Sequence, residues 1–179
     1  PRKKGNRSMI QNGIPLADAD YRFPPRELEV VDDSAKSLFV MTSDVERVYE
    51  GTRWGEGPVW FGDMHSLIWS DIPNDRVLRW DEKNKRVDVF LQPCGQLNGS
   101  ARDKNGRYIA CENIERRMVR LEYNGRFTVL ADEYDGKLLN SPNDVVVASD
   151  GAVWFTDPPF GISNWFEGEK QVSEQTART

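Results

Sequence analysis

The sequence predicts an all-β fold of the β-propeller class, and three observations support this prediction. A unit of about 40 residues recurs along the chain, each copy contains a hairpin signal, and the first two copies contain four strand-like runs each. Four short antiparallel strands in a unit of this length are typical of one propeller blade. A β-sandwich also joins short strands by turns, but it does not require such a regular internal repeat.

The three copies align from the first strand of each hairpin. These strands begin at Glu56, Asn98 and Asn143, which lie 42 and then 45 residues apart. In the second and third copies the turn contains Asn105-Gly106 and Asp150-Gly151, which favour two-residue hairpin turns. A β-favouring run then predicts each returning strand, and an acidic residue ends it. The runs are residues 67–69, 108–111 and 153–156, and the acids are Asp71, Glu112 and Asp157.

Two outer strands complete the first two copies. Residues 76–80 and 117–121 alternate polar with apolar side chains, as half-buried strands do. The fourth strands are predicted at residues 87–91 and 126–130. Two further β-favouring runs, residues 38–41 and 45–49, precede the first copy. The chain therefore contains two complete blades and the first hairpin of a third, whereas known rings need at least about four blades.

The repeat divides the chain into three predicted regions. Residues 1–36 form an extended lead-in with a basic tail, and residues 37–166 form the N-terminal blades. Residues 167–179 form a polar tail in which the chain breaks off. We interpret the basic tail as a solvated segment, and a targeting arm is the alternative.

Composition excludes several classes of protein. Of the 179 residues, 38% are hydrophobic, and the net charge of −5 argues against a nucleic-acid partner, which requires a basic surface. No apolar run is long enough to span a membrane, so we expect a soluble protein. A cytoplasmic location is the default, and a periplasmic or secreted one applies if the true N-terminus is missing. One histidine and two cysteines outside a CxxC pair disfavour zinc sites built from these residues.

The blade geometry predicts a site at one end of the hairpins. The acid that closes each hairpin is expected to face the residue that begins it. These pairs are Glu56 with Asp71, Asn98 with Glu112, and Asn143 with Asp157. Because blades are arranged radially, the three starts converge at one mouth of the central channel, where carboxylate and amide oxygens suit Ca²⁺, Mg²⁺ or Mn²⁺. Alternatively, such side chains hydrogen-bond to nearby backbone and cap turns.

Four motifs lie at the ends of the predicted inner hairpins. They are Arg53-Trp54-Gly55-Glu56-Gly57-Pro58-Val59-Trp60, Gly95-Gln96-Leu97-Asn98-Gly99, Gly106-Arg107-Tyr108-Ile109-Ala110-Cys111-Glu112, and Leu139-Asn140-Ser141-Pro142-Asn143-Asp144-Val145-Val146 followed by Phe155-Thr156-Asp157-Pro158-Pro159-Phe160-Gly161. These motifs resemble the SMP-30/gluconolactonase/luciferin-regenerating family, and most closely its bacterial gluconolactonases. The resemblance covers most of this chain but only about the first half of a family member. It implies a six-bladed propeller that hydrolyses sugar lactones with one divalent cation in its channel.

The resemblance also implies roles for individual residues. Glu56 and Asn143 match metal ligands of the family, and Asn98 matches a residue that binds either the metal or the substrate. We expect Glu112 beside the substrate. A further ligand, an Asp that is also the favoured general base, is expected beyond Thr179, so no catalytic residue is assigned within this chain. The implied cation is calcium first, with zinc, magnesium or manganese as alternatives.

Together these features predict metal-dependent hydrolysis of a small-molecule sugar lactone by the full propeller. The 179-residue chain alone is expected to be inactive because it lacks the general base. Gln96 stands where animal members of the family carry an Arg that holds the sugar. Two alternatives remain open. The chain is a non-catalytic fragment or half-propeller that acts with a partner chain, or it belongs to a related propeller hydrolase with another lactone or a phosphotriester as substrate.

Overall fold

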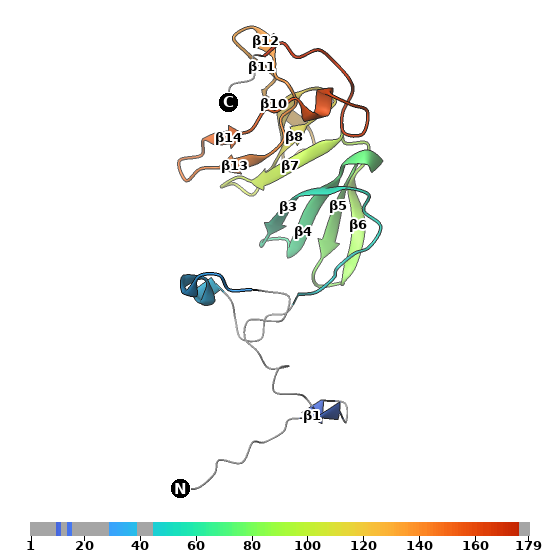
Figure 1. Ribbon diagram of the computed structural model, residues 1–179, viewed down its shortest axis with the longest axis vertical. Coiled ribbons are helices and arrows are strands. Elements are labelled where there is room, and N and C mark those ends of the chain that lie inside the picture. The colour runs from blue at the N-terminus through green and yellow to red at the C-terminus, as the bar shows by residue number, and fades with distance from the viewer. Residues whose placement is uncertain (1–9, 12–13, 16–28, 39–44, 176–179) are drawn as a thin grey trace. The chain divides into compact units, whose positions relative to one another are not determined.

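A computed structural model describes residues 10–11, 14–15, 29–38 and 45–175 (Figure 1). The chain divides into two units, Pro1–Arg47 and Val48–Thr179. The first unit contains an antiparallel strand pair and a short 3-10 helix, namely β1 (Ile10–Gln11), β2 (Ile14–Pro15) and η2 (Asp33–Leu38). The basic tail and most of the predicted lead-in lie outside the described residues.

The second unit is built from antiparallel sheets whose strands follow chain order. The first sheet contains β3 (Gly55–Phe61), β4 (Ser66–Asp71), β5 (Arg76–Asp81) and β6 (Arg86–Leu91). The second contains β7 (Leu97–Arg102), β8 (Tyr108–Glu112), β9 (Arg117–Leu121) and β10 (Phe127–Ala131). A third hairpin pairs β13 (Val145–Val147) with β14 (Val153–Phe155). The remaining elements are η3 (Ile72–Asn74), β11 (Glu133–Tyr134), β12 (Lys137–Leu138) and η4 (Phe160–Ile162).

The two four-stranded sheets confirm the all-β fold and the blade repeat predicted from the sequence. Each strand predicted within the two blades and the third hairpin is present, with ends that differ by at most two residues. The strand expected at residues 45–49 does not form, and Leu38 lies in η2. Residues 39–41 of the other early run lie outside the described residues. The predicted region boundaries at residues 36 and 166 stay predictions.

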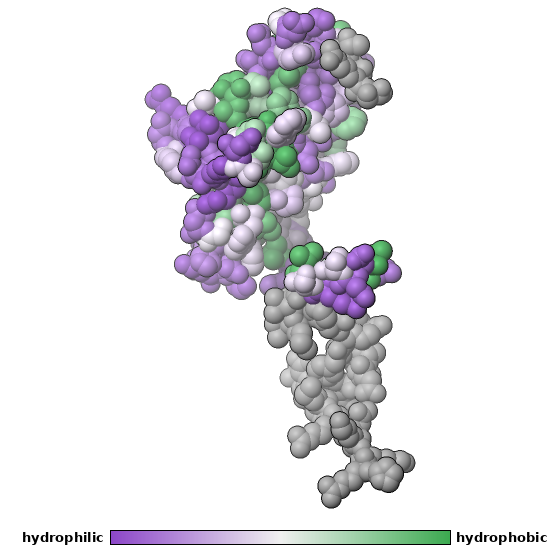
Figure 2. Space-filling model, turned by 90° about the vertical axis from the view of Figure 1, so that its left-hand side faces the viewer, coloured by the Kyte–Doolittle hydropathy of each residue, from purple (hydrophilic) through white to green (hydrophobic). Residues whose placement is uncertain are grey.

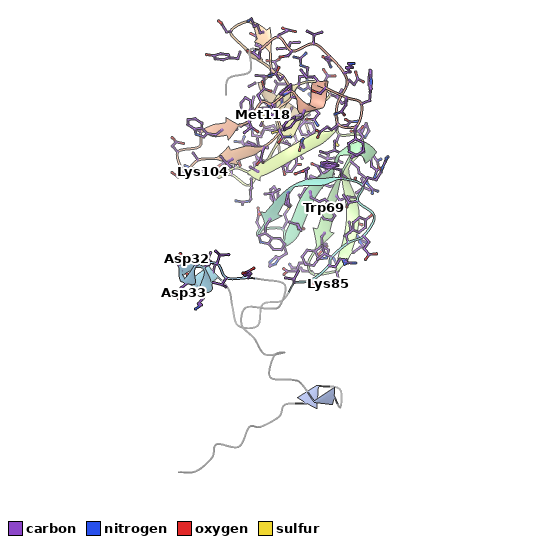
Figure 3. The ribbon with its side chains drawn as sticks, viewed as in Figure 1. Asp32, Asp33, Trp69, Lys85, Lys104 and Met118 are labelled. Atoms are coloured by element: carbon purple, nitrogen blue, oxygen red, sulfur yellow. The ribbon has the colours of Figure 1, made fainter. Side chains whose placement is uncertain are left out.

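Apolar side chains between neighbouring sheets form the core. Alternate residues of β8 face different neighbours, because successive side chains of a strand point to opposite faces. Tyr108 and Ala110 join a cluster with Phe61 and other residues of the first sheet. Ile109 and Cys111 join a second cluster, which includes residues of the third hairpin. Met118 of β9 also belongs to this second cluster (Figure 3). The second blade is thus packed on both of its faces.

The first two inner strands contain a β-bulge, which corrects the predicted pairing. Glu56 pairs with Ser70 instead of Asp71, and Leu97 instead of Asn98 pairs with Glu112. The register shifts between residues 56 and 59 in β3, and between residues 97 and 100 in β7. The extra residue of a bulge displaces the ladder by one position. In the third hairpin the correction is similar, since the N–H of Asn143 donates to the carbonyl of Thr156 (2.9 Å).

Two residues at equivalent positions connect each blade to the next. Asp75 and Arg116 lie four residues after the closing acids, and both have left-handed backbone, with φ of 49° and 55°. Asp75 Oδ1 accepts a hydrogen bond from the N–H of Gln96 (2.8 Å), which leads into β7. Arg116 Nε donates to the carbonyl of Leu139 (2.7 Å), which precedes the third hairpin. Residues of opposite charge therefore fix the start of the next inner strand in both blades.

Hydrophobic residues also lie on the surface of the second unit, as Figure 2 shows for one face. Trp69 is buried within the first sheet (Figure 3), whereas Trp60 and Trp154 are 44% and 68% exposed.

Burial raises the pKa of the Cys94 thiol to about 12 and also raises that of Cys111, so both cysteines are packing residues. No helix in the described ranges has the length and apolar character needed to cross a membrane.

Candidate functional site

The three predicted metal ligands lie at the starts of three adjacent inner strands. β7 lies between β3 and β13 and contacts both (Figure 1). Glu56 and Asn98 are each the second residue of their strand, and Asn143 lies two residues before β13. The N–H of Gly99 donates to the carbonyl of Asn143 (2.8 Å), which joins the second and third inner strands directly. The structure therefore places the three strand starts side by side, and their metal-binding role stays a prediction.

Glycine after each of the first two candidates permits this close approach. Gly57 has a φ of +56°, and a Cβ at this position would lie 2.5 Å from the carbonyl oxygen of Asn98. A Cβ on Gly99 would overlap the carbonyl oxygen of Asn143. A side chain at either position would force the inner strands apart. The Glu-Gly and Asn-Gly pairs thus bring the candidate ligands together.

The candidates carry side-chain oxygens of the kind that a hard cation binds. Glu56 is exposed, and its Oε1 accepts a hydrogen bond from the indole Nε1 of Trp54 (3.2 Å). Asn98 is 3% exposed and Asn143 is half-buried. Within the described ranges, neither amide side chain has a hydrogen-bond partner. One carboxylate and two amide oxygens suit a divalent cation such as calcium. No group of three His, Cys, Asp or Glu that could hold a metal occurs in the same ranges, so the set depends on amides.

The acids at the ends of two hairpins cap the loops that lead into those hairpins. Asp71 is fully buried, and its Oδ1 accepts a hydrogen bond from the N–H of Arg53 (2.9 Å). Asp157 accepts hydrogen bonds from the N–H groups of Asn140 and Ser141 (2.8 Å each). Burial alone would raise the pKa of Asp71, but side-chain and backbone donors lower it below its ordinary value. Burial raises the pKa of Asp157 despite its donors. These contacts agree with the turn-capping alternative.

Glu112, predicted beside the substrate, is 7% exposed and forms an ion pair with Arg117. Arg117 Nε donates to Glu112 Oε2 at 2.7 Å. A Cβ on Gly95 would overlap Glu112 Oε1, so the carboxylate packs directly on the backbone before β7. The pair matches Asp71 and Arg76 of the first blade. Glu112 therefore has a structural partner, and its contact with substrate stays a prediction.

The loop of residues 163–168 places Phe166 and Glu167 near Trp54 and Glu56. The sequence did not predict this proximity. The Phe166 ring packs edge to face against Trp54, with centroids 5.4 Å apart and planes at 72°. Burial and the negative charge of Glu56 raise the pKa of Glu167, so the two carboxylates lie close enough to repel each other. The signal in the sequence was an aromatic pair before Glu-Gly in an otherwise polar segment.

A cavity of about 1090 Å³ borders only one of the three candidate ligands. Asn143, Phe155 and Asp157 line it from the third hairpin. Glu56 and Asn98 are absent from its walls. The cavity therefore adjoins the start of the third inner strand and does not include the first two candidates.

Comparison with known proteins identifies a family whose members are similar to this chain. The family model described as SMP-30/Gluconolactonase/LRE-like region matches residues 54–168, a segment that contains all three candidate ligands. A curated gluconolactonase from Zymomonas mobilis subsp. mobilis is 30% identical over 162 residues. This match covers 83% of the present chain and 43% of the relative.

Two solved structures are also similar. One, described as a gluconolactonase from Xanthomonas campestris, is 41% identical with a TM-score of 0.69, over 72% of this chain and 42% of that one. The other, described as a putative gluconolactonase, is 37% identical with a TM-score of 0.69, over 73% of this chain and 45% of that one. The chain thus spans less than half the length of these relatives. Its blades and converging inner strands define a β-propeller protein. The chain belongs to the SMP-30/gluconolactonase/LRE-like family.

Proposed function

We propose that the protein is part of a metal-dependent sugar-lactone hydrolase in which Glu56, Asn98 and Asn143 bind one divalent cation. The adjacent starts of β3, β7 and β13 carry this proposal, because they present one carboxylate and two unengaged amides in the described ranges. The similarity to gluconolactonases supports a lactone as substrate. Calcium is the cation we expect first, since the donors are hard oxygens, and zinc, magnesium and manganese are alternatives.

In this proposal the candidate residues have different roles. Glu56 and Asn143 hold the cation, and Asn98 on the middle strand orients either the cation or the lactone. When bound, a divalent cation supplies Lewis-acid activation of a carbonyl and of water. Glu112 lies beside the substrate. Hydrolysis also requires a carboxylate that removes a proton from water, and none of the residues of this chain is assigned that role.

Substitution of Glu56 or Asn143 tests the proposal. In the full-length protein, Glu56→Gln and Asn143→Ala should each lower gluconolactone hydrolysis by at least about 100-fold, because removal of a ligand oxygen should cost no less than the 10- to 100-fold typical for groups that only orient a ligand. A pH indicator follows the acid produced. A chelator should also remove the activity of the unaltered protein, and added calcium should restore it.

Two matched substitutions serve as controls for these variants. Glu82→Gln and Asn105→Ala change a half-buried and an exposed residue, respectively, in turns at the opposite end of the blades. Both should retain the rate of the unaltered protein. Unchanged rates in Glu56→Gln and Asn143→Ala as well would contradict the proposed site.

Rates on different substrates distinguish the remaining enzyme alternatives. The purified protein should hydrolyse gluconolactone faster than a lactone without hydroxyl groups or a phosphotriester. A faster rate on the phosphotriester would assign the site to another class of propeller hydrolase.

A further inference from the structure

Trp54 contacts a predicted metal ligand directly. Its indole Nε1 donates to Glu56 Oε1 at 3.2 Å, and Oε2 accepts no hydrogen bond from the described residues. Trp54 lies two positions before Glu56, in the bend that leads into β3. The hydrogen bond therefore restricts the rotation of an otherwise exposed carboxylate.

The backbone and the ring of Trp54 are themselves held in place. Its N–H donates to Asp71 Oδ1 (3.3 Å), and its carbonyl accepts a hydrogen bond from the N–H of Ile72 (3.2 Å). Its ring packs against Phe166 in the edge-to-face arrangement that aromatic pairs favour. The indole is thus fixed although 48% of the residue is exposed.

Phe166 belongs to the loop of residues 163–168, which has one hydrogen bond within the loop and one to the residue before β7. Asn164 Oδ1 accepts a hydrogen bond from the N–H of Phe166 (2.7 Å). The N–H of Gly168 donates to the side-chain oxygen of Gln96. Gly168 has a φ of +86°, and a Cβ there would overlap a backbone carbonyl, so glycine is required. The loop therefore presents Phe166 to Trp54 in a defined position.

The same loop places a negative charge near the candidate ligand. Glu167 follows Phe166, and its carboxylate interacts unfavourably with that of Glu56. The loop therefore contributes both an aromatic ring and a negative charge to the surroundings of Trp54 and Glu56.

We propose that Trp54 is a positioning residue for the cation site, in which its indole N–H holds Glu56 Oε1, leaves Oε2 for the cation, and is supported by Phe166. This inference rests on the proposed metal-binding role of Glu56. Groups that orient a metal ligand commonly change metal affinity by about 10- to 100-fold.

Trp54→Phe tests the inference, because phenylalanine retains a ring beside Phe166 but lacks the N–H. Calorimetric titration of the protein with calcium should give an affinity about tenfold lower than that of the unaltered protein. Trp60→Phe is the matched control, since Trp60 is similarly exposed on β3 and no described contact joins it to a candidate ligand. Its calcium affinity should not change. Thermal unfolding in a chelator should be the same for Trp54→Phe and the unaltered protein, which separates positioning from a general loss of structure.

The possible results distinguish this inference from the proposed function. Equal calcium affinity in Trp54→Phe and the unaltered protein, with binding abolished in Glu56→Gln, overturns the positioning role and leaves the metal site standing. If the unaltered protein binds no calcium, zinc, magnesium or manganese, both proposals are wrong. If Trp54→Phe unfolds at a lower temperature in chelator, Phe166→Leu decides. Weaker calcium binding in that variant with unchanged unfolding supports the inference, and unchanged binding overturns it.

Discussion

Asp71 connects the stability of the first blade to the geometry of the candidate site. Its Oδ1 accepts a hydrogen bond from the N–H of Trp54, and its Oδ2 accepts one from Arg76 Nε (2.9 Å) and one from Asn74 Nδ2 (2.8 Å). A carboxylate removed from water is costly unless donors surround it, and these donors meet that requirement. Because Trp54 contacts Glu56, the buried acid acts on the candidate ligand through the backbone.

Asp71→Asn should destabilise the protein in a pH-dependent way. The change leaves Arg76 without its buried partner, which should lower the free energy of unfolding by about 3 kcal/mol near neutral pH. The folded-state pKa of Asp71 lies below the ordinary value of 3.8. Its stabilisation is therefore complete above that value and is lost as the pH falls through the folded-state pKa. Denaturant unfolding across this range should show the two proteins converging in acid.

A similar substitution on the surface provides the control. Asp88→Asn removes the partner of Arg86 and Arg79 in more exposed ion pairs, and we expect it to cost about 1 kcal/mol or less. A difference between Asp71→Asn and the unaltered protein that persists undiminished in acid would contradict the role given to the carboxylate.

At the scale of the strand, the bulges in β3 and β7 determine where the candidate ligands lie. Each bulge adds one residue to an inner strand, just after Glu56 in β3 and around Asn98 in β7, and it bends the strand locally. The glycine at this point then touches the backbone of the next inner strand. Spacing between blades at the site is therefore set by backbone contact and not by large side chains.

Gly99→Ala should strongly disturb this contact. The new methyl group would overlap the carbonyl of Asn143 and lie 2.6 Å from the Cα of Asp144, and neither atom can move without its strand. We expect a loss of about 3 kcal/mol in the free energy of unfolding, measured in urea. Gly62→Ala is the control, because its nearest neighbour would be the Trp60 indole at 3.5 Å, an ordinary contact. An equal effect of the two substitutions would argue against close backbone approach at the inner strands.

At the scale of the second unit, the blades share their cores. Buried residues of the first and second sheets form one cluster, and buried residues of the second sheet and third hairpin form another. Because β8 contributes to both clusters, the second blade links the first blade to the third hairpin. We therefore expect the sheets to unfold together.

Leu97→Ala tests this cooperativity. Leu97 is fully buried in the first cluster, so its truncation should cost about 2–5 kcal/mol. Hydrogen exchange should show lower protection in β4 and β8 alike. Val129→Ala in β10, where the side chain is 42% exposed, should have a much smaller effect. Loss of protection confined to one sheet would show that the blades unfold independently.

The sequence predicted the strands well because the repeat is local. Alternating apolar residues and Asn-Gly or Asp-Gly turns define each hairpin without reference to distant residues. The one-residue shift at Glu56 and Asn98 was not predictable, because a bulge leaves the strand pattern almost unchanged. Contacts of Phe166 and Glu167 with the first blade were missed because they join segments far apart in the chain. The equivalent roles of Asp75 and Arg116 were not predicted, because the two residues occupy matching positions in the repeat but carry opposite charges.

Caps on the hairpins also bear on how the chain folds. Asp71 binds the N–H of Arg53, 18 residues earlier, and Asp157 binds that of Asn140, 17 residues earlier. Closing a loop of this length costs little chain entropy compared with pairing distant segments. The first and third hairpins can therefore each secure their own preceding loop before a neighbour docks. We expect folding to start in either of these hairpins and to spread along the array, as it does in other proteins built from repeats.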